Sequence, residues 1–144
     1  MHELGYLDDP VYELGWLAGQ ALRAARVIVD IGLHCEMRIP STERFHPGER
    51  WRSELGLPFL RERTGHPAEY LASEVDRYLG MPGQAISYKL GERVWLEGRD
   101  RARSRLGSKF DLKQFHRVAL DMGAMGLDQL SVELDAIDLS DGAS

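Results

Sequence analysis

Cysteine is almost absent from this chain, since Cys35 is the only one among 144 residues. A single cysteine excludes a disulfide within the chain and a metal site built from several thiolates. This usage is typical of a reducing compartment, and we predict a cytoplasmic protein. Cys35 follows His34 directly, but adjacent side chains on a helix point apart, so the two are not expected to act as nucleophile and base.

Long apolar runs and a strong excess of one charge are also missing. The longest apolar stretch, residues 27–33, is interrupted by Asp30 and is far shorter than a transmembrane helix. No signal peptide is visible either, so no membrane segment is expected. The net charge of −5 and the pI of about 5.5 argue against electrostatic attraction to nucleic acid. We therefore expect neither nucleic acid nor a membrane as a partner.

A metal-binding motif is begun but not completed near the N-terminus. His2 and Glu3 open a sequence like the zinc motif HExxH, but Tyr6 stands where the second histidine belongs. We therefore predict no metal ligands in this chain.

The apolar residues that are present follow a helical period, and strand-like alternation of any length is missing. This pattern predicts an all-α fold: an irregular or orthogonal bundle of several helices, in a single domain or lobe over residues 1–144. Proline and glycine mark several of the helix ends. The predicted helices cover residues 10–34, 49–64, 67–79, 84–106, 111–122 and 127–137.

The first predicted helix, residues 10–34, has an unusual distribution of side chains. With about 100° of rotation per residue, a polar stripe runs along a helix that is apolar on nearly all other sides. This pattern predicts a buried helix whose ionisable groups face a specific partner. The stripe consists of Tyr12, Trp16, Gly19, Arg23, Arg26, Asp30 and His34.

Two interpretations of this stripe remain open at the level of the sequence. Arg26 and Asp30 are four residues apart, so they can neutralise each other in a structural network with Arg23 and His34. Alternatively, Arg26 anchors a ligand. Tyr88 in the predicted helix 84–106 is similarly either a core tyrosine with a satisfied hydroxyl or a functional group.

Four separated segments of the chain resemble one bacterial family, in the order in which the family has them. They are LGYLDDP (residues 4–10), RAARVIVDIGLH (23–34), SEVDRYLGMPGQAISYKLGE (73–92) and LGSKFDLKQFHRVAL (106–120). The family is called domain of unknown function 885, and the chain resembles its C-terminal part. Proteins of this family are similar to gluzincin zinc metallopeptidases, which are mostly helical and carry HExxH on one helix and a glutamate ligand on a following helix.

In the family, those zinc-binding elements precede the part that this chain resembles. The resemblance therefore implies the helical, substrate-side lobe of a zinc-peptidase-like hydrolase that is not catalytic alone. It implies no cofactor in this chain, with zinc expected only when the N-terminal half is present, and a peptide or peptide-like substrate.

The resemblance also implies roles for individual side chains. Tyr88 would be an oxyanion donor, and His34 a second donor or a hydrogen-bonded partner of the zinc region. Arg26 would anchor the substrate, because a guanidinium is suited to bind a carboxylate. The remaining candidates for substrate binding are Gln84, Lys89 and Asp30.

A second function stays open beside this one. The chain could be a free-standing helical module that binds a peptide or a partner protein in its polar groove, while an independent catalyst is a distant third. A lobe of a larger protein exposes apolar surface and is expected to self-associate with rising concentration. A strictly monomeric, very stable protein would favour the free-standing module.

Overall fold

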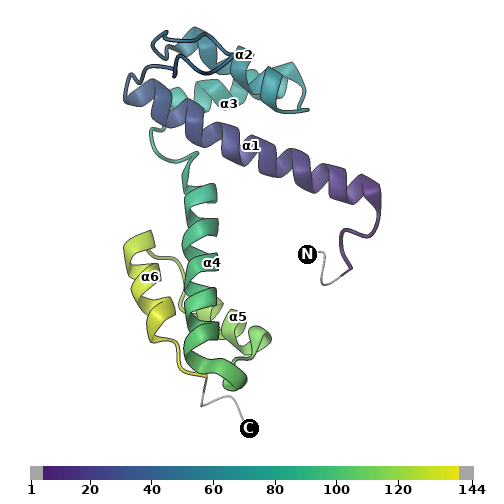
Figure 1. Cartoon of the computed structure of the whole chain (residues 1–144), viewed down its shortest axis with the longest axis vertical. Helices are drawn as coiled ribbons and strands as arrows, with labels where there is room; N and C mark the ends of the chain where they lie inside the picture. The colour runs from purple at the N-terminus through teal and green to yellow at the C-terminus, as the bar shows by residue number, and fades with distance from the viewer. Residues whose placement is uncertain (1–4, 140–144) are drawn as a thin grey trace. The chain divides into compact units, whose positions relative to one another are not determined.

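The computed structural model describes residues 5–139, and in this range it contains six α-helices, a short 3₁₀ helix and no strand (Figure 1). The prediction of an all-α fold is thereby confirmed. The chain forms two compact units, which meet in sequence between Lys89 and Leu90. That residues 1–144 make a single domain stays a prediction. The elements are α1 (Pro10–His34), α2 (Ser53–Arg63), α3 (Ala68–Gly80), α4 (Ser87–Leu106), η2 (Gly107–Lys109), α5 (Leu112–Asp121) and α6 (Leu127–Ala136).

The long helix α1 has local signals at its start. The Asp9 carboxylate accepts a hydrogen bond from the backbone N–H of Val11 at 2.8 Å, and Pro10 occupies the first turn. The C-terminal half of α1 packs against α2 and α3 (Figure 1). Its buried residues are Leu22, Ala25, Val29, Asp30 and Gly32.

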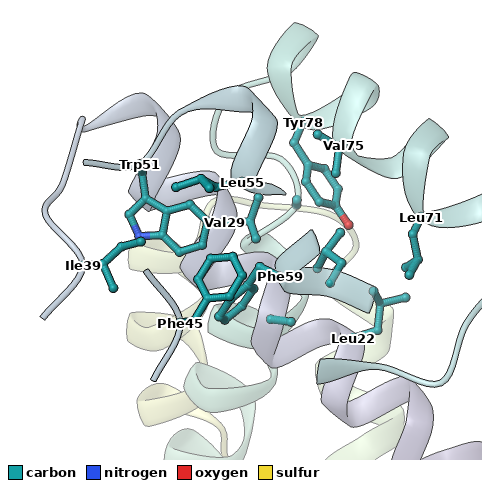
Figure 2. Packing of buried hydrophobic residues seen from close by; sticks show 13 residues of the cluster. Leu22, Val29, Ile39, Phe45, Trp51, Leu55, Phe59, Leu71, Val75 and Tyr78 are labelled. Carbon is teal, nitrogen blue, oxygen red and sulfur yellow. The ribbon is translucent and has the colours of Figure 1, made fainter. Parts of the chain in front are cut away.

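The core of the first unit combines these α1 residues with α2, α3 and the loop between α1 and α2. The rings of Phe45, Trp51 and Phe59 lie together beside Val29 (Figure 2), with the Trp51 and Phe59 ring centres 5.2 Å apart. The loop therefore belongs to the core and does not merely cover it. The remaining buried apolar members are Ile39, Leu55, Leu60, Leu71, Val75, Tyr78 and Ala85.

The N-terminal half of α1 differs from the prediction of a buried helix. Val11 is 72% exposed, Leu14 68% and Leu17 49%. The prediction is wrong for these turns because α2 and α3 lie against only the C-terminal half of α1. The N-terminal half of α1 extends past both helices (Figure 1). A row of large apolar side chains is thus left in contact with solvent.

Two helices, α2 and α4, begin more than one residue later than predicted. Helix α2 begins at Ser53 because the preceding residues pair with the chain before them: Ile39 N–H donates to the Glu49 carbonyl at 2.8 Å, and Trp51 N–H to the Met37 carbonyl at 2.9 Å. Pro58 lies inside α2 without dividing it in two.

Helix α4 begins at Ser87, because residues 81–86 form turns instead of helix. The bonds there join residues three apart, as from the Gln84 N–H to the Met81 carbonyl at 3.3 Å. This turn segment carries Gly83 with a positive φ of 80°, a backbone conformation that glycine adopts without steric cost.

The second unit, from Leu90 onward, contains most of α4 with α5 and α6. Its core includes Phe115 and Leu134, both fully buried. Asp111 caps α5 by accepting a hydrogen bond from the Gln114 N–H at 2.7 Å, and the Phe110 and Phe115 ring centres are 5.7 Å apart. Both contacts join residues close in sequence, so local chemistry sets the start of α5.

Candidate functional site

Several polar side chains of the first unit contact Arg26, in the C-terminal half of α1. Its Nε donates to the Tyr78 hydroxyl at 2.8 Å, and its Nη2 donates to Glu74 Oε2 at 2.5 Å and to the Tyr70 hydroxyl at 3.3 Å. These three partners follow one another at intervals of four on α3, so they lie on one face of that helix. We call the group formed by Arg26, these three partners and Arg77 the arginine cluster.

Glu74 is shared between two guanidinium groups. Arg77 Nε donates to Glu74 Oε1 at 3.2 Å and its Nη2 to Oε2 at 3.0 Å, which is a bidentate arrangement. The Tyr78 hydroxyl donates to Oε2 at 2.8 Å. Since two cations meet a single carboxylate, the arginine cluster carries a net positive charge.

The protonation states in the arginine cluster follow from these contacts. Burial by itself would raise the pKa of Glu74, but the hydrogen bonds from Arg77 and Tyr78 and the charge of Arg26 outweigh it and lower this pKa. Burial, followed by the hydrogen bond to Glu74, raises the pKa of Tyr78. At neutral pH, Glu74 is therefore ionised and Tyr78 is neutral.

Two further predicted residues join the arginine cluster from the segment after α3. The Tyr88 ring centre lies 5.5 Å from Arg26 Cζ, within the range of a cation–π contact, and the Tyr88 side chain is half exposed. Gln84 Oε1 accepts a hydrogen bond from Arg77 Nη1. The structure therefore brings together Arg26, Gln84 and Tyr88.

Asp30 and His34 form a separate pair one to two turns further along α1. Asp30 is only 2% exposed, and each of its carboxylate oxygens lies 3.2 Å from the Gly83 N–H. His34 Nδ1 is 2.8 Å from Asp30 Oδ1. This contact assigns the ring hydrogen to Nδ1, so Nε2 is the nitrogen left for an outside group.

The interpretation in which Arg26 and Asp30 neutralise each other is wrong. Arg26 pairs with Glu74, whereas Asp30 pairs with His34 and the Gly83 backbone. The physical reason is that α3 presents a carboxylate and hydroxyls to Arg26, while Asp30 faces the turn that follows α3. The contacts of Arg26 with Glu74 and of Asp30 with Gly83 join residues far apart in the sequence, so only the tertiary structure sets them.

Lys89, the last of the predicted substrate-binding residues, contacts an earlier part of α1. Its Nζ donates to Gln20 Oε1 at 2.9 Å. Gln20 precedes Arg26 by more than one helical turn. The predicted residues thus fall into three places along α1, with Lys89 near Gln20, Tyr88 and Gln84 at the arginine cluster, and His34 with Asp30.

Sequence reasoning missed the α3 members of the arginine cluster. It assigned no role to Tyr70, Tyr78, Glu74 or Arg77. In the structure Glu74 is buried and Tyr70 is 43% exposed. A signal was available, because an acidic residue midway between two tyrosines on an otherwise apolar face needs a cationic partner.

The described part of the chain does not fit a metal ion. Within residues 5–139, no group of three or more histidine, cysteine, aspartate or glutamate side chains is placed to hold one. His34 with Asp30 supplies two candidate ligand side chains, fewer than a zinc site needs.

No helix between residues 5 and 139 combines the length and the apolar character that a membrane span requires.

Comparison with known proteins shows similarity to a protein family and to a solved structure. The model of a family of bacterial proteins of unknown function, DUF885, matches residues 1–134. The chain is similar to the crystal structure of a "putative lipoprotein" from Colwellia psychrerythraea, with a TM-score of 0.75 and 37% identity over 94% of this chain. It spans only 21% of that longer chain. No curated protein matches it.

Proposed function

The chain belongs to the DUF885 family of bacterial proteins, and on this basis we propose that it is the C-terminal, substrate-side lobe of a larger zinc-peptidase-like hydrolase. Residues 5–139 do not fit a metal, so in this proposal the zinc would be bound by a part of the longer protein that this chain does not cover. The 21% coverage of the related lipoprotein chain supports this division. Cytoplasmic location stays a prediction.

The observation that carries the proposal is the exposed apolar surface on the first half of α1. Val11, Tyr12, Leu14 and Leu17 are each between 49% and 72% exposed, and they follow one another within two turns. Large apolar side chains grouped in this way mark a surface that another polypeptide covers. We name these four residues the α1 apolar surface and propose that the remainder of the longer protein packs on it.

In this proposal the chain supplies groups that bind and orient the substrate. The Tyr88 hydroxyl donates a hydrogen bond to the oxygen of the scissile carbonyl as negative charge develops there. His34 Nε2 is left to accept a second hydrogen bond, because the contact with Asp30 holds the ring hydrogen on Nδ1. Arg26 is held by Glu74, so it contributes positive charge to the arginine cluster more than it contacts the substrate directly.

The test uses the full-length product of the native gene. We expect a mass well above the 16.3 kDa of this chain, bound zinc and hydrolysis of peptides. Tyr88→Phe in that protein removes only the hydroxyl, and we expect it to lower kcat by about a hundredfold with an unchanged melting temperature. Tyr12→Phe, on the α1 apolar surface, is the matched control and is expected to leave kcat unchanged.

Three outcomes would contradict the proposal. They are a native product with the mass of this chain alone, a longer product without zinc, and a Tyr88→Phe enzyme with full kcat. The first would favour the free-standing binding module.

One observation favours that second function. An apolar pocket of about 480 Å³ lies between α1 and the loop that follows it, lined mainly by Ala25, Ile28, Phe45, Trp51 and Phe59. Because all of its lining belongs to the first unit, it needs no second chain to form. Titration of this chain with an apolar peptide, followed by Trp51 fluorescence, tests whether the pocket binds such a ligand.

A further inference from the structure

The charges of the arginine cluster do not balance. Glu74 is paired with both Arg26 and Arg77, at N–O distances of 2.5 and 3.0 Å. The neighbouring hydrogen-bonding groups, Tyr70 and Tyr78, are neutral phenols. One positive charge therefore remains uncompensated at a partly buried place, where it attracts an anion more strongly than it would in bulk water.

Arg77 is the cation that an outside group can reach. The side chain of Arg26 is 11% exposed and that of Arg77 is 30% exposed. Arg26 also has neighbours on several sides, with Tyr78 and Tyr88 rings at 6.0 and 5.5 Å from its Cζ in addition to its bonds to Glu74. The surplus charge is consequently available to solvent through Arg77.

The hydrogen bonds of Arg77 leave part of its guanidinium unused. A guanidinium has five N–H groups. Among the described residues, Arg77 uses one from Nε and one from Nη2 for Glu74, and one from Nη1 for Gln84 Oε1. The two remaining N–H groups, one on each terminal nitrogen, can bind a planar carboxylate as a pair.

The surroundings of Arg77 fit a carboxylate that ends a peptide. Gln84 accepts from Arg77 through Oε1, so its amide nitrogen is the atom left to donate to an added anion. Tyr70 and Tyr88 are 43% and 50% exposed and offer aromatic surface to the side chain of a terminal residue. A singly charged carboxylate also matches the single surplus charge.

We propose that Arg77, assisted by Gln84, binds the free C-terminal carboxylate of a peptide beside the rings of Tyr70 and Tyr88. This inference rests on the proposed function, because the peptide as the source of the carboxylate comes from there. In this inference Arg77 contacts the carboxylate directly, and Arg26 and Glu74 position the Arg77 side chain.

The test compares three probes on the 144-residue chain: N-acetyl-trialanine with a free carboxylate, the same peptide as its C-terminal amide, and acetate. Binding is followed by NMR through the Nε–H signals of the arginine side chains. We expect the free acid to bind about tenfold more tightly than the amide. The reason is that an uncharged amide cannot form ionic hydrogen bonds with the Arg77 guanidinium. We also expect it to bind more tightly than acetate and to shift the Arg77 signal most.

Protein variants provide the second arm. Arg77→Lys keeps the charge but loses the paired N–H geometry, and we expect it to reduce the preference for the acid over the amide by about tenfold. Arg93→Ala, which removes a surface ion pair with Glu97 in the second unit, is the control and is expected to bind like the wild type. Circular dichroism establishes that each variant is folded.

Equal binding of acid and amide, the absence of binding by both, or an unchanged preference in Arg77→Lys would overturn the inference. Acetate binding as tightly as the peptide acid would overturn the assignment to a peptide. Because the ligand comparison needs no substitution, it stays decisive even if Arg77→Lys unfolds the chain. Failure of the proposed function would appear elsewhere, as a native product without zinc or peptide hydrolysis.

Discussion

At the scale of single residues, Glu74 is the carboxylate that pairs with both guanidinium groups of the arginine cluster. Its side chain is 11% exposed and holds Arg26 and Arg77 together. Glu74→Gln leaves two partly buried guanidinium groups without their carboxylate, so we expect a loss of about 3 kcal/mol in the free energy of unfolding at pH 7. Urea denaturation followed by circular dichroism measures this loss. Glu62→Gln on the exposed face of α2 is the control, expected to change stability by less than about 0.5 kcal/mol.

The lowered pKa of Glu74 also predicts a direction for the pH dependence. In the unfolded chain this carboxyl has a pKa of about 4.3, and in the folded chain the pKa is lower, so the unfolded state binds more protons between the two values. The contribution of Glu74 to stability is therefore complete above the unfolded pKa and is lost as the pH falls through the folded one. In the Glu74→Gln variant, this part of the acid-induced loss of stability should be absent. An identical dependence of stability on pH in the wild type and the variant would contradict the lowered pKa of Glu74.

At the scale of elements, two glycines of α1 show where the helix is packed and where it is open. A Cβ at Gly32 would lie 2.6 Å from the Trp51 indole, whereas a Cβ at Gly15 meets nothing within 4 Å. Gly32→Ala should destabilise the chain by about 2 kcal/mol through overpacking, in spite of alanine's better helix propensity. Gly15→Ala should stabilise it by up to about 1 kcal/mol.

Thermal unfolding of both variants measures this contrast within a single helix. Equal shifts of the melting temperature in the same direction would show that Trp51 does not pack on Gly32 as described. The contrast also distinguishes the two halves of α1, since an added methyl group is expected to lower the melting temperature only in the packed C-terminal half.

At the scale of the whole molecule, the α1 apolar surface predicts self-association. Leu14 and Leu17 are 68% and 49% exposed, and covering them removes apolar area from water. We expect the average mass in sedimentation experiments to rise with concentration, and Leu14→Glu combined with Leu17→Glu to weaken the association by about tenfold or more. Val132→Glu on α6, 61% exposed in the second unit, is the control. A wild-type chain that stays monomeric would argue against a surface covered by other polypeptide.

Short-range signals along the chain predict the helical class, most helix ends and several local contacts. The cap at Asp111, the start of α1 at Pro10 and the turn at Gly83 depend on neighbouring residues, and short-range chemistry decides them. The family resemblance likewise pointed to Arg26, Gln84 and Tyr88, which the structure brings together.

The partners of those residues were decided only by the tertiary structure. Arg26 and Glu74 are 48 positions apart, and Asp30 and Gly83 are 53 apart. Periodicity places a side chain on a face of its own helix but does not specify which helix packs there, so the sequence offered nearby Asp30 as a partner of Arg26 and could not indicate Glu74. The exposure of Leu14 has the same origin, because an apolar side chain is buried only where another element covers it.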